Sequence, residues 1–210
     1  NIFYIMPYTS IPDASFPFVV NLWFSTEPPG TSLEFTDPFN IPFYGPIQYW
    51  DTQLVTDMSN AFNSRTSFND DISSWNTSNV TNMSYMFNNA SVFNSPINSW
   101  NVGNVTDMTN MFGLALTFNQ PLNNWNVSGV QNMSQMFSGA YAFNQPLNNW
   151  NVSNVTNMSI MFADTDAFNQ SLNNWDVSGV TNMYSMFQGA SAFNKPLNNW
   201  NVSNVTNMST

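Results

Sequence analysis

The sequence predicts an α/β solenoid, in which short strand–helix repeats stack on one another behind a small N-terminal β cap. Trp recurs every 25 residues from Trp50 to Trp200 without an insertion. Val, Met and Phe recur at fixed distances from each Trp, whereas residues 1–49 lack this period. Because one short strand and one short helix cannot bury their apolar side chains alone, consecutive units are expected to stack.

The repeat organises residues 50–210. Six full units cover 50–199, and a partial seventh unit begins at Trp200. Positions within a unit are numbered from its Trp as position 1. Stacking is expected to place the Trp at position 1 and the Asn at position 20 in two continuous ladders, with the Asn side chains bonding along the stack. The ladder residues are Trp50, Trp75, Trp100, Trp125, Trp150, Trp175, Trp200, Asn69, Asn94, Asn119, Asn144, Asn169 and Asn194.

Two apolar spacings inside a unit predict its strand and its helix. Leu122, Trp125 and Val127 fall first, fourth and sixth in their segment, and the last pair alternates as on one face of a strand. From Val130 to Ala140 the apolar residues recur every three or four positions, which predicts a helix of about ten residues. Ser or Asn at positions 4 and 5 supplies the N-cap. Most residues at position 15 tolerate the left-handed conformation in which helices end.

Residues 1–49 are expected to form a cap or an assembly arm. Apolar runs at Ile2–Met6, Phe18–Phe24 and Ser32–Phe35 read as strands, and the segment 28–30 reads as a turn. One interpretation is a small β cap that covers the first unit. The other is that the first ten residues form an arm that adds a strand to a neighbouring molecule.

The composition excludes several classes of function. The chain has no His and no Cys, which removes serine- and cysteine-type triads, zinc sites built on thiolate or imidazole, and disulfides. No cofactor and no catalytic residue is therefore expected. Twelve acidic residues against two basic ones give a net charge of −10, which disfavours binding to nucleic acid or to anionic lipid. No apolar run reaches the ~20 residues of a membrane span, so membrane insertion is not expected.

Carboxylates are the remaining chemical option. Asp164 and Asp166 are two residues apart, and Asp70 and Asp71 are adjacent. Either pair suggests a calcium site or acid–base chemistry on a sugar. Because neither pair recurs in the other units, the preferred interpretation is solvated surface acids, and no metal site is predicted.

Asn-X-Ser/Thr sequons begin at fourteen positions. N-glycosylation is one interpretation, in a secretory pathway that performs it. The other is structural, because the repeat itself spells the sequon wherever Asn is needed for bonding between units. The candidate glycosylation sites are Asn76, Asn89, Asn104, Asn126, Asn151 and Asn201.

The repeat resembles a known family. The segments 150–162 and 167–174 are similar to the 25-residue repeat of BspA-like surface proteins, common among mycoplasma lipoproteins, and the resemblance covers 50–210. It implies a leucine-rich-repeat-like solenoid, exposure on or outside a cell, and a role in adhesion or in building surface structures; it implies no catalytic residues. The first unit departs from the pattern at Ala61, Arg65 and Asp70–Asp71, as expected for a unit adapted to a neighbouring cap.

The two ends leave alternatives open. The chain begins at Asn1 without an initiator Met, which fits a removed leader or an excerpt. It stops at Thr210 within a unit, which fits either a truncated chain or an uncapped end that docks on the next copy and so polymerises head to tail.

The functional hypothesis is an extracellular, non-enzymatic structural protein that assembles with copies of itself into a surface fibre or filament. Only 7% of the residues are charged, against about a quarter in typical soluble domains, which favours the cell exterior. The alternative is a cell-surface adhesin module that binds a host protein or a glycan.

Overall fold

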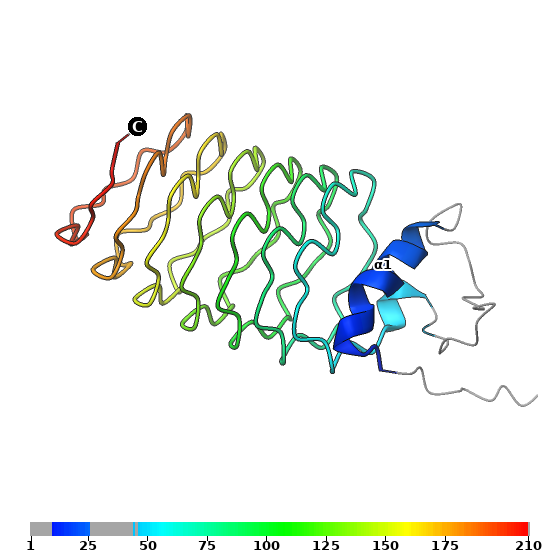
Figure 1. The fold of residues 1–210 in the computed structure, drawn as a ribbon. Helices are drawn as coiled ribbons and strands as arrows, with labels where there is room; N and C mark the ends of the chain where they lie inside the picture. Colours follow the sequence, from blue (N-terminus) through cyan, green and yellow to red (C-terminus); the bar gives the residue numbers. More distant parts are fainter. Residues whose placement is uncertain (1–9, 26–43, 45, 210) are drawn as a thin grey trace, which may run out of the picture.

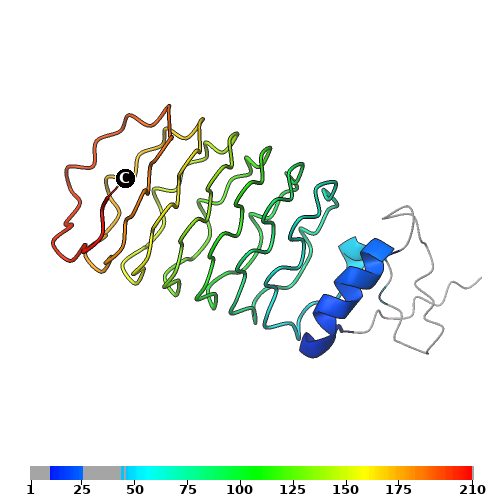
Figure 2. The same cartoon turned by 45° about the horizontal axis from the view of Figure 1, so that its top comes forward.

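In the computed structural model, the 25-residue units are coils that stack side by side into a column (Figure 1). The structure describes residues 10–25, 44 and 46–209. Its helices are the 3₁₀-helix η1 (Asp13–Ser15), the α-helix α1 (Phe16–Ser25) and the 3₁₀-helix η2 (Ile47–Tyr49). The turned view shows the same order of coils, with α1 across the N-terminal end of the column and the C-terminus at the other end (Figure 2).

The predicted α/β solenoid of strand–helix repeats is wrong. Between residues 50 and 209 the coils contain no α-helix and no strand longer than an isolated bridge. One parallel bridge at position 8 links each pair of consecutive coils, beginning with Asp57 to Asn82 and ending with Asn182 to Asn207. The column is therefore a stack of turns held by single bridges, without a sheet.

Left-handed residues explain why the predicted helix does not form. Positions 11 and 15 have positive φ angles in the six full coils, including 60° at Ile160 and 69° at Gly139. An α-helix cannot pass through such a residue, because every residue of the helix needs a negative φ. The chain instead makes successive turns, in which the amide of Ala163 bonds to the carbonyl of Ile160 at 3.2 Å. These turns bring apolar residues inward at the same three- to four-residue spacing as a helix.

The predicted strand is also interrupted by turns. The amide of Trp125 bonds to the carbonyl of Leu122 at 3.0 Å, and the amide of Val130 bonds to the carbonyl of Val127 at 3.0 Å. Amides that do not close such turns reach the neighbouring coil. The amide of Phe137, for example, bonds to the carbonyl of Met161 at 2.9 Å. Backbone bonding between coils thus substitutes for regular secondary structure.

Stacked aromatic rings fill the interior of the column. The two Phe rings of one coil lie face to face, with centroids 3.9 Å apart for Phe62 and Phe68. Equivalent rings of consecutive coils are also nearly parallel, at 5.4 Å between Phe62 and Phe87. Since the Phe side chains at positions 13 and 19 are 2% exposed or less from Phe62 to Phe168, this array is the core.

The N-terminal cap is helical, so the predicted β cap is wrong for the described residues. The predicted strand Phe18–Phe24 lies within α1. The buried residues of α1 are Phe16, Val19, Val20 and Trp23, and this three- and four-residue spacing is that of one helix face. The predicted strands Ile2–Met6 and Ser32–Phe35, and the first nine residues of the proposed arm, lie outside the described residues.

The cap is fitted to the first coil by aromatic and polar contacts. The ring of Trp23 meets that of Trp50 edge to face, with centroids 5.9 Å apart. The guanidinium of Arg65 lies 4.2 Å from the centre of the Phe24 ring and donates a 2.8 Å hydrogen bond to the Oδ1 of Asn21. Arg65 is thus one of the departures of the first unit from the repeat, and it contacts α1 directly.

Candidate functional site

The seven Trp residues of position 1 lie on one side of the coil interior. Trp50 and Trp75 stack with centroids 5.7 Å apart and an interplanar angle of 11°, and Trp150 and Trp175 stack at 6.3 Å and 4°. From Trp75 to Trp200, each indole Nε1 donates to the backbone carbonyl of the residue 28 positions earlier, at 2.8–3.1 Å. The Trp side chains from Trp50 to Trp175 are 2–4% exposed, so they pack the column and leave no aromatic platform for a ligand.

The Asn residues of position 20 form a chain of hydrogen bonds along the column. The Oδ1 of each of the first five accepts from the backbone amide of the Asn in the next coil, at 2.7–3.0 Å. Three Gln residues at position 21 add bonds to the same Asn residues; Gln145 donates to both the carbonyl and the Oδ1 of Asn119. The Oδ1 atoms of these Asn residues are therefore engaged in hydrogen bonds between coils.

The candidate glycosylation sites fall into two groups. Asn76, Asn126, Asn151 and Asn201, all at position 2, are exposed, and each Oδ1 accepts the amide two residues later at 3.1–3.2 Å. By contrast, the Nδ2 of Asn104, the atom to which a glycan attaches, donates to the carbonyl of Ser78 at 2.7 Å.

The remaining site, Asn89, has a φ of 56° and is half-buried, and its Nδ2 lies 3.5 Å from the Oγ of Ser64. The position-2 residues are therefore the sites best presented for modification.

The paired carboxylates are separate surface groups. Burial raises the pKa of Asp70, whereas hydrogen bonds from the side chain and backbone of Ser73 lower the pKa of Asp71. Asp164 and Asp166 are both exposed. The described residues contain no group of three acids placed to hold a metal ion.

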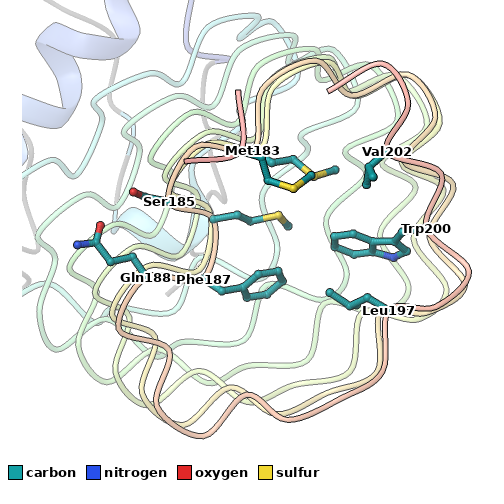
Figure 3. Close-up of a pocket in the computed structure, with 9 residues that line it drawn as sticks. Met183, Ser185, Phe187, Gln188, Leu197, Trp200 and Val202 are labelled. Carbon is teal, nitrogen blue, oxygen red and sulfur yellow. The ribbon is translucent and has the colours of Figure 1, made fainter. Parts of the chain in front are cut away.

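An apolar hollow of about 400 Å³ opens in the face of the last described coil. Figure 3 shows Met183, Phe187, Leu197, Trp200 and Val202 pointing into the ring of the coil, while Ser185 and Gln188 point away from it. These inward residues occupy positions that the following coil covers elsewhere in the column. Val202 is 39% exposed and Met208 is 52% exposed, in contrast to 1% and 0% for the equivalent Val102 and Met108.

A second apolar surface lies along one edge of the column. We call it the apolar edge and define it as four side chains at positions 15, 17 and 18 of the second to fourth coils, with exposures of 37–47%. Its residues are Val92, Leu114, Leu116 and Tyr141. The features that the units share do not predict this edge. The signal in the sequence that indicates the edge is a departure from the repeat. Large apolar residues stand at these positions where the other units have small or polar ones.

The geometry defines the class of the protein, a repeat protein built of stacked coils with aromatic and Asn ladders. No helix within the described part of the chain has the length and apolar character needed to span a bilayer.

The family-model comparison then identifies the family. A family model described as a mycoplasma protein of unknown function, DUF285, matches residues 34–146 and 117–210. The chain therefore belongs to this mycoplasma repeat family. No curated protein and no solved structure matches the chain.

Proposed function

We propose that this chain is a non-enzymatic structural protein of the cell exterior that associates end to end through its column. The observation that supports the proposal most is the stacking itself, in which each coil presents inward apolar side chains that the next coil covers, as at Val102 and Met108, which are 1% and 0% exposed. The same positions of the last described coil line the apolar hollow, which a further coil or a second copy would fit. Contiguous apolar surface of this kind is typical of an interface. At the other end of the column, Phe18 and Tyr49 are 54% and 57% exposed. Because the two ends of the column differ, a contact between them would be head to tail, which does not close and so extends into a filament.

The exterior location is supported by the composition and by the repeat. A chain in which 7% of the residues are charged relies on Asn, Ser and Thr for the hydration of its surface, unlike a typical cytosolic domain. The similarity of the repeat to that of BspA-like surface proteins points to the same location and to a role in surface structures. Protease treatment of intact cells, followed by detection of the chain, would test the location.

The assembly experiment uses residues 1–210 and two variants. Sedimentation over a range of concentrations, with electron microscopy of the same samples, should show particles that lengthen as concentration rises. The double change Val202→Asn with Met208→Asn should keep the protein monomeric, because it places polar groups in the apolar contact. The matched control is Tyr184→Ser, which changes an exposed side chain at position 10 to the residue present there in four other full coils.

A monomer at every concentration would refute end-to-end association of this chain. It would favour a further unit of a longer polypeptide as the occupant of the hollow. Equal assembly of the double variant would place the contact elsewhere.

The second candidate function is an adhesive module that binds another protein or a glycan. The apolar edge favours it, because four exposed apolar side chains of this surface lie on consecutive coils, away from both ends of the column.

A further inference from the structure

The repeat supplies an internal reference for what its fold requires at the apolar edge. Position 17 holds Thr66, Ser91, Asp166 and Ser191 in four coils, but Leu116 and Tyr141 in the third and fourth. Since all six coils have the same turns, the fold does not need a large apolar residue at this position. Between residues 75 and 199, four of the five large apolar side chains that are most exposed belong to the edge, and Tyr184 is the fifth. Single exposed apolar residues are ordinary, whereas a cluster on one edge indicates an interaction surface.

The edge residues are held close together by the stacking of coils. The amide of Ala142 bonds to the carbonyl of Leu116 at 3.2 Å, which places Tyr141 in register beside Leu116. Leu114 leans over the next coil, since a Cβ added at Gly139 would lie 2.7 Å from its Cδ2. Ala115, between the two exposed leucines, is fully buried and anchors the turn that presents them.

The charge around the edge indicates the chemistry of its partner. Asp164 and Asp166 continue positions 15 and 17 into the fifth coil, and both are exposed. The amide of Ala167 bonds to the carbonyl of Tyr141 at 3.2 Å, so Asp166 lies one coil away from the Tyr141 ring position. The chain has only two basic residues, and one of them, Arg65, contacts the cap. The apolar edge is therefore bordered by negative charge.

We propose that the apolar edge, with Asp164 and Asp166 at its border, docks a protein segment that presents apolar side chains next to Lys or Arg. The apolar side chains would cover Leu116 and Tyr141, and the cations would face the two carboxylates. Charge complementarity of this kind selects the partner and speeds association, while the buried aromatic and aliphatic contacts supply most of the affinity. The inference does not rest on end-to-end association, because the edge lies along the side of the column.

The test is fluorescence anisotropy with labelled synthetic peptides. The probe is an amphipathic peptide of Leu and Lys, and the comparison peptide has Glu in place of every Lys. Wild-type protein should bind the cationic peptide saturably and the anionic peptide at least about tenfold more weakly, a difference of ~1.4 kcal/mol. Added salt should weaken binding of the cationic peptide.

Variants taken from neighbouring coils keep the fold while removing the edge. Leu116→Ser with Tyr141→Ser introduces the residue present at positions 91 and 191, and should weaken binding about tenfold. Asp164→Gly with Asp166→Ser uses the residues of positions 189 and 191, and should reduce both the affinity and its dependence on salt. Tyr184→Ser, at an exposed position outside the edge, should bind as wild type does. Circular dichroism of each variant confirms that it is folded.

Four results would overturn the proposal. One is equal binding of the two peptides, and another is unchanged binding by the Leu116 and Tyr141 variant. The third is peptide binding that is lost when Val202 and Met208 are changed, which would move the site to the hollow. Self-association of wild-type protein that disappears in the edge variant would assign the edge to a second copy and would also contradict the proposal.

Discussion

Individual residues of this chain accept a backbone conformation that their side chains do not favour. Among the residues that the structure describes, ten other than Gly have positive φ angles, and one of these, Ile160, is β-branched. A left-handed conformation costs an ordinary residue about 1–2 kcal/mol, and Asn tolerates it better because its side chain bonds locally. Stacking between coils imposes the left-handed conformation, because the amides at positions 9, 11, 13 and 15 must point along the column to reach carbonyls of the next coil.

We predict that Ile160→Asn raises the free energy of unfolding by about 1 kcal/mol through relief of this strain. The reciprocal change Asn110→Ile, at the same position two coils earlier, should lower it by a similar amount. Urea denaturation monitored by Trp fluorescence measures both. The explanation fails if the two changes shift stability in the same direction.

The Asn ladder shows how a single side chain serves two coils. The Oδ1 of Asn119 accepts from the amide of Asn144 at 3.0 Å and from the Nε2 of Gln145 at 3.1 Å. A half-buried amide that loses its acceptor is costly, because water replaces the acceptor only in part.

Asn119→Ala should therefore lower the free energy of unfolding by about 1–3 kcal/mol. Asn119→Asp retains an acceptor oxygen and should recover most of the loss. Asn148→Ala, at an exposed position whose side chain bonds only to the adjacent Asn149, is the matched control and should change stability by less than about 0.5 kcal/mol. Urea denaturation of wild type and the three variants tests whether the Asn ladder stabilises the fold. Equal stability of wild type and Asn119→Ala would contradict a structural role.

At the scale of the element, α1 and η1 act as the cover of the first coil. The Oδ1 of Asp13 accepts from the amides of Thr56 and Asp57 at 2.7 and 3.1 Å, and its Oδ2 accepts from the hydroxyl of Thr56 at 2.8 Å. The backbone hydrogen bond from Thr56 is the main cause that holds the pKa of Asp13 below its ordinary value of 3.8. The charged form of Asp13 thus binds the cap to the repeat.

This pKa shift predicts how the cap responds to acid. Because the pKa is lower in the folded state, Asp13 stabilises the protein above pH 3.8, and its contribution disappears as pH falls through the lowered value. Since the side chain is exposed, Asp13→Ala should lower the free energy of unfolding at neutral pH by only about 1 kcal/mol. The difference in the free energy of unfolding between wild type and variant should become smaller in acid. Urea denaturation at a series of pH values measures this difference. A difference that stayed constant in acid would show that the charge of Asp13 is not involved.

The whole molecule is a stack of equivalent coils, and hydrogen bonds between coils join residues from 24 positions apart, as at Thr52 and Asn76, to 28 positions apart, as at Trp100 and Ile72. The bridges at position 8 and the stacked rings at position 13 recur after 25 residues along the column. A coil is therefore a removable unit, provided that the register of the remaining coils is kept.

Deletion of residues 125–149 should leave a folded column one coil shorter, because Trp150 then takes the place of Trp125. The variant should unfold cooperatively, with a smaller dependence of stability on urea because less surface is buried. Deletion of residues 125–136 should prevent cooperative unfolding, because it places Phe137 where a Trp belongs. Far-UV circular dichroism and urea denaturation test both variants, and similar behaviour of the two would show that register does not matter.

The 25-residue period and the inward positions of the coil could be predicted from the sequence, but the local conformation of the chain could not. Val130, Met133 and Phe137 have a spacing that fits a helix and also fits consecutive turns, since both return a side chain to one side after three or four residues. The helical spacing of Phe16, Val19 and Trp23 in α1 does not stand out from the sequence, because eight of the ten residues of this helix are apolar. The apolar edge was overlooked because it departs from the repeat.

The sequence by itself determined the 25-residue register, the columns of Trp, Phe and Asn, and the low charge of the surface, because each depends only on which residue recurs and how often. The tertiary structure alone decided that the coils are made of turns and that a helix covers the first one. It also decided which apolar side chains remain in solvent. The physical reason is that the amides at alternate positions find their acceptors in the neighbouring coil, and this bonding selects left-handed residues over a continuous helix.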